Sequence, residues 1–206
     1  MQSVPAGSPA AEEKRRLRKE LRTLRQALDA SALGRAAGAV RAAAAALGAL
    51  PAARTVAGYV ACDGEVDVAP LLDDARRRGA VVLLPRRAHP LLELVLADPA
   101  AAHVARAGAG MLEPTGPACD LARLASPAIA FVPAVALDRR GHRLGRGGGD
   151  YDRLLPTLRA LGWTIVGVCH ASQLRDTLPT ESHDQPVDAI LTDAGLLLPH
   201  PLPPHP

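Results

Sequence analysis

Six short apolar runs, separated by helix-like or loop stretches, restrict the fold of this chain more than any other feature of its sequence. They are TVAGYV at 55–60, AVVLLP at 80–85, LLELVLA at 91–97, AIAFVPAVAL at 128–137, TIVGVC at 164–169 and DAILT at 188–192. Stretches such as APLLDDARRRG and YDRLLPTLRALG lie between them and have helical character. Alternation of apolar strands with helices is typical of a parallel sheet that helices cover. We therefore predict an α/β fold with a largely parallel sheet.

Two helices are expected before the first of these strands. Leucines at 17, 21, 24 and 28 are spaced by four, three and four, which predicts an amphipathic helix over residues 12–28. Lys14 and Arg18 lie four apart on one face of it, which by itself is typical of a solvated helix face. The alanine-rich segment 31–47 predicts a second helix with Ser31 as its N-cap.

The length of 206 residues suits one ordinary domain. We expect a flexible N-terminus at residues 1–11, a single α/β domain at 12–198 and a loose proline-rich tail at 199–206, because LLLPHPLPPHP continues neither a helix nor a central strand. For 98–127 the pattern is irregular, and loops with a short helix are expected there.

Cysteine content and hydropathy bear on the compartment. The three cysteines form no CxxC motif, which argues against a disulfide framework or a zinc site and indicates a reducing compartment. No apolar run approaches the roughly 18 residues of a membrane span, and the N-terminus has no apolar core of a signal peptide. We expect a cytoplasmic protein without membrane contact.

The charge balance bears on binding partners. The formal net charge is +3, and almost all basic residues are arginine, which favours small anionic ligands or weak attraction to polyanions. Aromatic residues make up only 2% of the chain, which argues against stacking on single-stranded bases. We expect no nucleic-acid partner, although a basic phosphate- or RNA-binding module stays an alternative.

The stretch LGRGGGDYDR at 144–153 indicates an anion site. It holds four glycines and two carboxylates between an apolar strand and a helix-like segment. Glycine lets backbone N–H groups approach a ligand, the helix start adds partial positive charge, and Arg146 supplies a fixed guanidinium. The loop matches neither GxxxxGK[ST] nor GxGxxG, since Asp150 stands at the last glycine of the latter. Taken alone, the loop predicts either a phosphate site or a simple chain reversal.

Two carboxylates near this loop are candidate magnesium ligands. Asp152 lies just past the loop, where a magnesium ion that bridges phosphates would need a carboxylate. An acid favoured by the helix dipole is its ordinary alternative. Asp184, in TESHDQPVD before the last strand, is by itself typical of a turn residue.

The segment FVPAVALDRRGHRLGRGGGDYDRLL at 131–155 resembles the signature of the 5-formyltetrahydrofolate cyclo-ligase family, also called methenyltetrahydrofolate synthetase. That signature has a proline-containing strand, a D-x-x-G turn and R-L-G-R-G-x-G-Y-Y-D. Other segments agree with the family in order and distance: the basic helix with Lys14 and Arg18, YVACDGEVD at 59–67, LLPR at 83–86, MLEP at 111–114 and LPTESHDQPVDAILTD at 178–193. The resemblance thus covers about residues 12–193.

The resemblance implies a fold, an activity and its ligands. The fold would be that of sugar-phosphate isomerases and coenzyme A transferases (NagB/RpiA/CoA transferase-like), with helices added at the N-terminus. The activity would be closure of 5-formyltetrahydrofolate to 5,10-methenyltetrahydrofolate, through a phosphorylated formyl group. ATP and Mg²⁺ would be required, and ADP and phosphate would be released. Separately, we expect the protein to be a monomer. A sugar-phosphate isomerase or coenzyme A transferase on the same scaffold is the alternative within enzymes.

The family's site residues carry over onto matching positions. The implied ATP contacts are Lys14, Arg18, Arg143, Leu144, Gly145, Arg146, Gly147, Gly148, Gly149 and Tyr151. The implied folate contacts are Val60, Glu65, Arg146, Gly147, Gly148, Gly149 and Asp150. Magnesium would be held by Asp152 and Asp184, and the candidate catalytic residues are Arg146 and Tyr151.

One position departs from the family pattern. Asp150 stands where the signature has the first tyrosine of Y-Y-D. A carboxylate near a polyphosphate weakens nucleotide binding by Coulomb repulsion unless the metal or Arg146 offsets it. The role of position 150 therefore does not transfer from the family.

Overall fold

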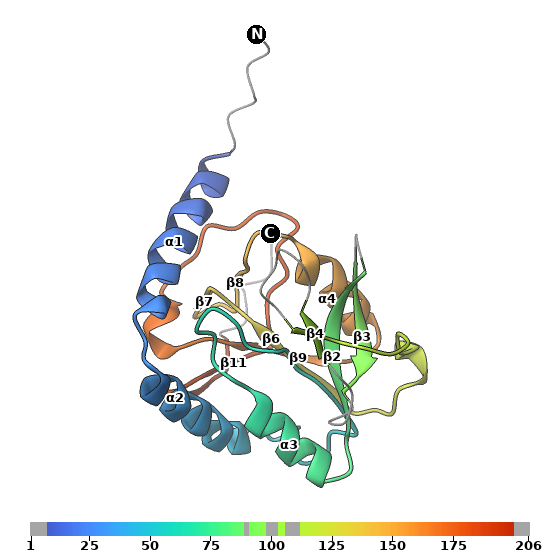
Figure 1. Cartoon of the computed structure of the whole chain (residues 1–206). Helices are drawn as coiled ribbons and strands as arrows, with labels where there is room; N and C mark the ends of the chain where they lie inside the picture. Colours follow the sequence, from blue (N-terminus) through green and yellow to red (C-terminus); the bar gives the residue numbers. More distant parts are fainter. Residues whose placement is uncertain (1–7, 89–90, 98–102, 106–111, 200–206) are drawn as a thin grey trace.

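The computed structural model describes residues 8–88, 91–97, 103–105 and 112–199. Seven strands form the main sheet in the order β12-β11-β9-β6-β1-β2-β3 (Figure 1). Its five inner strands are parallel, and β3 and β12 pair antiparallel at the two edges. The prediction of an α/β fold with a largely parallel sheet is confirmed. The strands are β1 (Thr55–Ala57), β2 (Val81–Ala88), β3 (Leu91–Leu96), β6 (Ala128–Pro133), β9 (Thr164–Val168), β11 (Ala189–Thr192) and β12 (Gly195–Leu197).

Helices cover both faces of this sheet. Successive residues of a strand point to opposite faces, so each strand contributes to two cores. Val82 and Leu84 of β2 belong to the core under α2 (Ala30–Ala43) and α3 (Ala69–Arg77). Leu83 belongs instead to the core under α4 (Asp150–Ala160). Burial on both faces explains why the strands are continuous apolar runs in the sequence.

The N-terminal helix, α1 (Pro9–Gln26), packs on a separate small sheet. That sheet has the order β10 (Leu174–Arg175), β7 (Ala136–Asp138), β8 (Arg143–Leu144). Leu17 and Leu21 of α1 pack there against a third group of buried side chains, which includes Val135 and Leu144. Because β8 leads into the glycine-rich loop 145–149, this packing places α1 beside that loop (Figure 1).

The two helix starts differ from the sequence prediction. α1 begins at Pro9, and the Ser8 hydroxyl accepts the N–H of Ala11 at 3.2 Å. Residues 8–11 therefore belong to the helical part and not to a flexible N-terminus. The N-cap of α2 is Asp29 instead of Ser31, because the Asp29 carboxylate accepts the N–H of Ala32 at 2.7 Å.

The buried side of α1 also differs from the leucine pattern. Leu24 is 51% exposed, although its spacing placed it on the apolar stripe. Lys14 and Arg25 are buried instead, at 4% and 3% exposure. They turn inward because they meet the carboxylates and carbonyl groups of loops that pack on this helix.

The apolar run 128–137 forms two strands instead of one. β6 ends at Pro133, and the chain then crosses to the small sheet, where the Val135 N–H donates to the Leu144 carbonyl at 2.8 Å. The segment expected to be irregular contains β4 (His103–Ala105), β5 (Leu112–Pro114) and the 3-10 helix η2 (Leu121–Arg123). Residues 98–102 and 106–111 of that segment, and all of the expected tail except Pro199, lie outside the described residues.

Candidate active site

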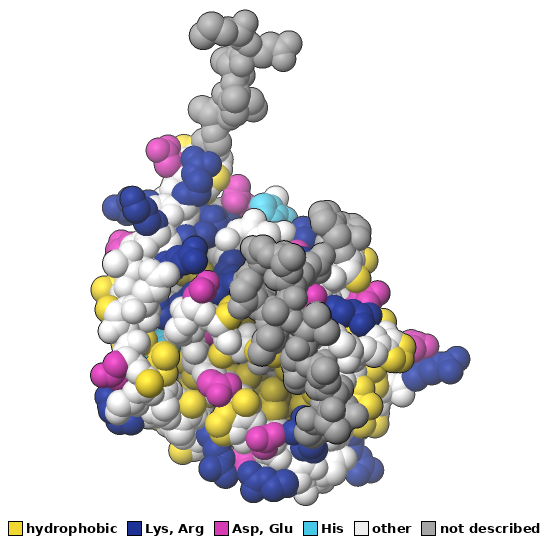
Figure 2. Space-filling view, in the orientation of Figure 1, with side chains coloured by type: hydrophobic (Ala, Val, Ile, Leu, Met, Phe, Trp, Pro, Cys, Tyr) yellow, Lys and Arg dark blue, Asp and Glu magenta, His cyan; other side chains and the backbone are white. Residues whose placement is uncertain are grey.

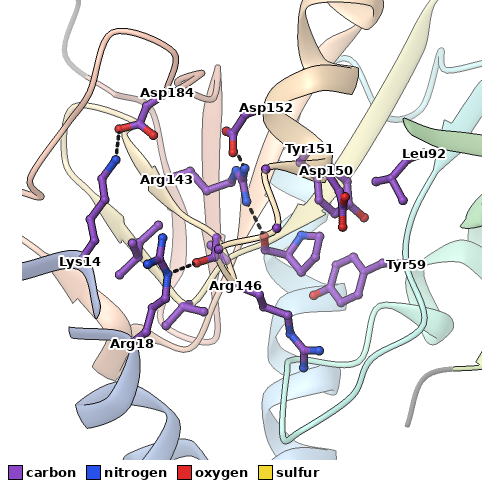
Figure 3. A pocket seen from close by; sticks show the side chains of 18 of the residues that line it. Lys14, Arg18, Tyr59, Leu92, Arg143, Arg146, Asp150, Tyr151, Asp152 and Asp184 are labelled. Carbon is purple, nitrogen blue, oxygen red and sulfur yellow. Dashed lines mark hydrogen bonds and ion pairs between the residues drawn. The ribbon is translucent and has the colours of Figure 1, made fainter. Parts of the chain in front are cut away.

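A cavity of about 490 Å³ lies at the carboxyl ends of β1, β2 and β6, between the glycine-rich loop and α1. This is the edge at which open α/β sheets bind their ligands. Every residue that the sequence predicted for the site lines this cavity: Lys14, Arg18, Val60, Glu65, the whole run 143–152 and Asp184. Figure 3 labels Lys14, Arg18, Asp184 and five residues of that run. What each of them binds stays a prediction.

The glycine-rich loop exposes backbone to the cavity at the start of α4. Gly147 has φ 102°, a left-handed conformation that favours glycine, and a Cβ there would lie 3.5 Å from the guanidinium carbon of Arg18. Arg18 in turn donates from Nε to the carbonyl of Gly145 at 2.8 Å, which ties α1 to the loop. The N-cap of α4 is Gly149, which has no side chain to cap the backbone N–H groups of the first turn. The loop and helix start thus have the features of an anion site.

Arg143 organises the wall behind this loop. Its NH2 group donates to Asp152 Oδ1 at 2.8 Å, and its guanidinium carbon lies 5.5 Å from the centroid of the Tyr151 ring. The Arg143 side chain is only 3% exposed, so its charge depends on Asp152 for compensation. Burial raises the pKa of the Tyr151 hydroxyl, and the negative charge of Glu65 raises it further. Tyr151 therefore keeps its proton at neutral pH and is suited to donate a hydrogen bond.

Lys14 lies between two carboxylates of the loop before β11. Its Nζ is 2.8 Å from Glu181 Oε2 and 2.5 Å from Asp184 Oδ2 (Figure 3 draws the second contact). Burial lowers the pKa of Lys14, but the hydrogen bonds to Asp184 and Glu181 outweigh burial and leave the pKa raised. Lys14 is thus a fully charged ammonium and not the solvated residue typical of a helix face.

Glu181 and His183 are cavity residues that the sequence reasoning missed. Together with Asp184 they offer three possible metal-ligating atoms within 4.8 Å of one another. Asp152, the other predicted metal ligand, lines the same cavity but is not part of this group. The signal was present in TESHD, where two carboxylates and an imidazole lie within four residues, 181–184. From the sequence, only Asp184 of this stretch was assigned to the site, through the family resemblance.

Glu65 and Arg146 meet on the other side of the loop. Arg146 donates from Nε to Glu65 Oε1 at 3.1 Å and from NH2 to Asp63 Oδ2 at 2.7 Å. The other oxygen of Glu65 accepts the N–H of Cys62 at 3.2 Å. Burial and the Glu65 carboxylate raise the pKa of the Cys62 thiol to about 11, so this cysteine is not a nucleophile at neutral pH.

Asp150 is held by two arginines. Arg87 NH2 lies 2.7 Å from Asp150 Oδ2, and Arg153 NH2 lies 2.7 Å from Asp150 Oδ1. From the sequence, the metal and Arg146 were the groups considered for offsetting this carboxylate. The structure instead supplies Arg87 from β2 and Arg153 from α4, and two guanidiniums around one carboxylate leave this corner of the cavity net positive.

Surface features outside the cavity add little evidence about binding partners. On the face drawn in Figure 2, basic side chains gather over α1 and again near the end of α3, with acidic side chains between them. Among the described side chains visible in this view, no continuous basic stripe of the kind that tracks a nucleic-acid backbone is seen. Within the described parts of the chain, every helix is too short or too polar to cross a bilayer.

Comparisons with known proteins agree with the motif. The model of the 5-formyltetrahydrofolate cyclo-ligase family matches residues 10–193. A protein of Escherichia coli K12 named 5-formyltetrahydrofolate cyclo-ligase is 35% identical over 152 residues, which cover 68% of this chain and 78% of the relative. A protein of the same name from Mycolicibacterium smegmatis is 34% identical over 143 residues, with 68% and 73% covered.

Two solved structures have the same fold. The 5,10-methenyltetrahydrofolate synthetase of Aquifex aeolicus superposes with a TM-score of 0.76 at 28% identity, over 94% of this chain and 96% of that one. The corresponding protein of Mycoplasma pneumoniae gives a TM-score of 0.69 at 21% identity, over 88% and 99%, and supports the fold alone.

Proposed function

The chain belongs to the 5-formyltetrahydrofolate cyclo-ligase family, and from that premise we propose that it closes 5-formyltetrahydrofolate to 5,10-methenyltetrahydrofolate at the expense of ATP. One observation carries the proposal: one cavity gathers all the predicted site residues, although they come from α1, the segment after β1, the glycine-rich loop with the start of α4, and the loop before β11. Its volume of about 490 Å³ is in the range of small-molecule sites.

The chemistry requires activation of a poor electrophile. The formyl group on N5 is an amide, and its oxygen is a poor leaving group. Transfer of the γ-phosphoryl group from ATP to that oxygen breaks the bond to ADP and forms an imino-phosphate. N10 then attacks the formyl carbon and loses its proton, and the carbon–oxygen bond breaks to release phosphate. The protein needs to align the two substrates and neutralise charge, and no side-chain nucleophile is required.

The cationic side of the cavity suits the phosphates. Arg18, Arg146 and the N–H groups of the loop 145–149 lie around the start of α4, where the helix dipole also favours negative charge. Arg143 would act on the phosphates indirectly, because it is buried and orients Asp152 and the Tyr151 ring. The protonated Tyr151 hydroxyl would donate to an oxygen of the phosphoryl or formyl group.

The other side of the cavity suits the folate. Val60, Tyr59 and Leu92 supply apolar or aromatic surface for a flat pteridine. Glu65 is an acceptor-only carboxylate, and the pteridine offers N–H donors. We propose that Glu65 binds and orients the pteridine.

The carboxylates of the site fit magnesium. Mg²⁺ prefers one or two carboxylates and retains water ligands. Glu181 and Asp184 already place carboxylate oxygens on a cation, the ammonium of Lys14, and His183 and Asp152 line the same cavity. We propose that Asp184 and Asp152 hold the ion with help from Glu181. Bound there, it would neutralise phosphate oxygens of ATP.

The activity is tested by mixing the protein with 5-formyltetrahydrofolate and MgATP. We expect the long-wavelength absorbance of the methenyl product to appear, with one ADP formed per product. Omission of ATP should abolish the absorbance, and omission of the folate should leave only slow ATP hydrolysis. Absence of product with a folded protein that binds neither substrate would refute the proposal.

Arg87 is expected to mask the charge of Asp150. Arg87→Gln removes one of the two guanidiniums, so the KM for ATP should rise about three- to tenfold, a Coulomb effect of roughly 1 kcal/mol for partly exposed groups. The double variant Arg87→Gln/Asp150→Asn should return the KM for ATP close to the wild-type value. Equal KM values in the single and double variants would show that the charge of Asp150 does not reach the nucleotide.

A further inference from the structure

Arg25 is a buried cation that lies behind the cavity wall. It is on the last turn of α1, its side chain is 2% exposed, and it does not line the cavity. Its Nε donates to the carbonyl of Asp63 at 2.6 Å. Its NH1 group has no hydrogen-bond partner among the described residues. A buried guanidinium with an unused donor is costly, so its position calls for a role.

The unused donor faces Glu65. NH1 of Arg25 lies 3.8 Å from Glu65 Oε1, whose side chain is 6% exposed. That separation is a few tenths of an ångström beyond a hydrogen bond. The same Oε1 atom accepts from Nε of Arg146 at 3.1 Å. One oxygen of Glu65 is therefore shared by two cations, one buried and one at the cavity.

The segment that carries Glu65 is built around Arg25. Gly64 has φ 73°, and a Cβ at that position would lie 2.9 Å from the Arg25 carbonyl oxygen. The carbonyl of Gly64 is 2.9 Å from His170 Nε2, which holds the segment from its other side. Arg25 cannot easily move away from Glu65, whereas the Arg146 side chain is 37% exposed and comes from a loop.

We propose that Arg25 is the positioning residue that holds the Glu65 carboxylate in place when Arg146 turns from Glu65 to the substrates. The inference rests on the proposed function, in which Arg146 engages phosphoryl oxygens during turnover. Without Arg25, that movement would leave a buried carboxylate with no cation, which is strongly unfavourable. With Arg25, a small shift of NH1 replaces the lost hydrogen bond. Arg25 thus acts on the folate through Glu65.

The charge environment of Glu65 contains two cations, Arg25 from α1 and Arg146 from the glycine-rich loop. Tyr59, Tyr151 and Cys62 also face Glu65, but their raised pKa values keep them neutral at physiological pH. Among the described residues, the two arginines therefore balance the Glu65 carboxylate.

The first experiment measures binding of 5-formyltetrahydrofolate by calorimetry, with Mg²⁺ and a non-hydrolysable ATP analogue present so that Arg146 is engaged. In Arg25→Gln we expect at least tenfold weaker folate binding, because Glu65 then loses the cation that orients it. Binding of the ATP analogue should change less than threefold. Arg25→Lys should recover most of the folate affinity, and Arg25→Gln should have little further effect in a Glu65→Gln background. Equal weakening of both substrates, or the same loss in the Glu65→Gln background, would refute the proposal.

The second experiment needs no substrate and separates this inference from the proposed function. Arg146→Ala and Arg25→Gln each leave Glu65 one cation, and the double variant leaves none. We expect the double variant to melt at least about 5 °C below the additive value, a shift that Glu65→Gln reverses. Additive shifts would overturn the proposal. A wild type that binds no folate but shows the coupled shifts would refute the proposed function alone.

Discussion

Arg146→Ala is expected to lower kcat/KM for 5-formyltetrahydrofolate and MgATP by about 10²- to 10³-fold, the usual effect of removing one donor that stabilises charge in a transition state. Arg146 lines the cavity, and its side chain is 37% exposed whereas that of Arg143 is 3% exposed, so it can reach a moving phosphoryl group. In the resting protein it is held by Glu65 and Asp63. The loss should fall mainly on kcat, because the interaction with substrate is strongest in the transition state.

The same substitution is expected to change stability little. The Arg146 side chain is 37% exposed, and Glu65 keeps Arg25 as a neighbouring cation when Arg146 is removed. We expect the melting temperature to fall by less than about 4 °C, a change of roughly 1–2 kcal/mol for a chain of this size. Arg16→Ala, at a side chain 73% exposed on α1, is the matched control and should leave both rate and stability unchanged.

Rates from the methenyl absorbance and melting curves from circular dichroism decide the outcome. A variant that keeps the wild-type rate would remove Arg146 from the reaction. A variant that loses rate and stability together would make its role structural. Arg146→Lys adds a finer test, because lysine keeps the charge but not the forked donor geometry, and should recover only part of the rate.

The fold was accessible from the sequence because its signals are local. Apolar runs such as 164–169 and 188–192 became strands β9 and β11 almost residue for residue. The run 128–137 was the exception. Whether a chain stays in one sheet after Pro133 or crosses to another depends on partners such as Leu144 and Val168, and no local pattern records them.

The site was accessible for a different reason. The glycine-rich loop, Arg146 and Asp152 are contiguous in sequence, and motif order linked them to Lys14 and Glu65. Pairings across long separations were not accessible. Arg87 and Asp150 are 63 positions apart, and nothing in either segment points to the other. Side chains of this kind decide the charge balance of the cavity.

The helix α1 shows how periodicity can mislead at a functional site. Its leucine spacing predicted Leu24 as buried, but the protein buries Lys14 and Arg25 and leaves Leu24 in solvent. Hydrophobic spacing describes the average preference of side chains for water. It does not describe a lysine or arginine whose charge is matched by carboxylates of other elements, as the ammonium of Lys14 is by Glu181 and Asp184.

Lys14 should favour binding of ATP and oppose binding of a divalent metal ion, and the substitution Lys14→Met tests both effects. Methionine removes the ammonium but keeps a side chain of similar length. Loss of a charged hydrogen-bond donor to phosphate, about 1.5–3 kcal/mol, should weaken ATP binding roughly 10- to 100-fold. Binding of Mn²⁺ as a probe for magnesium, measured without nucleotide, should instead become tighter, because the ammonium no longer competes for Glu181 Oε2 and Asp184 Oδ2.

The melting temperature of Lys14→Met should also depend on the charge balance at Glu181 and Asp184. Without Lys14, Glu181 and Asp184 face each other with no cation between them, so the variant should melt at a lower temperature than the wild type, and Mn²⁺ should restore most of the loss. Lys19→Met, at an exposed position of the same helix, is the control and should alter neither Mn²⁺ nor ATP binding. Titration by electron paramagnetic resonance gives the Mn²⁺ affinity directly. If Lys14→Met weakens Mn²⁺ and ATP binding alike, Lys14 supports the carboxylates and does not compete with a metal ion, and the assignment of the ion to Asp184 fails.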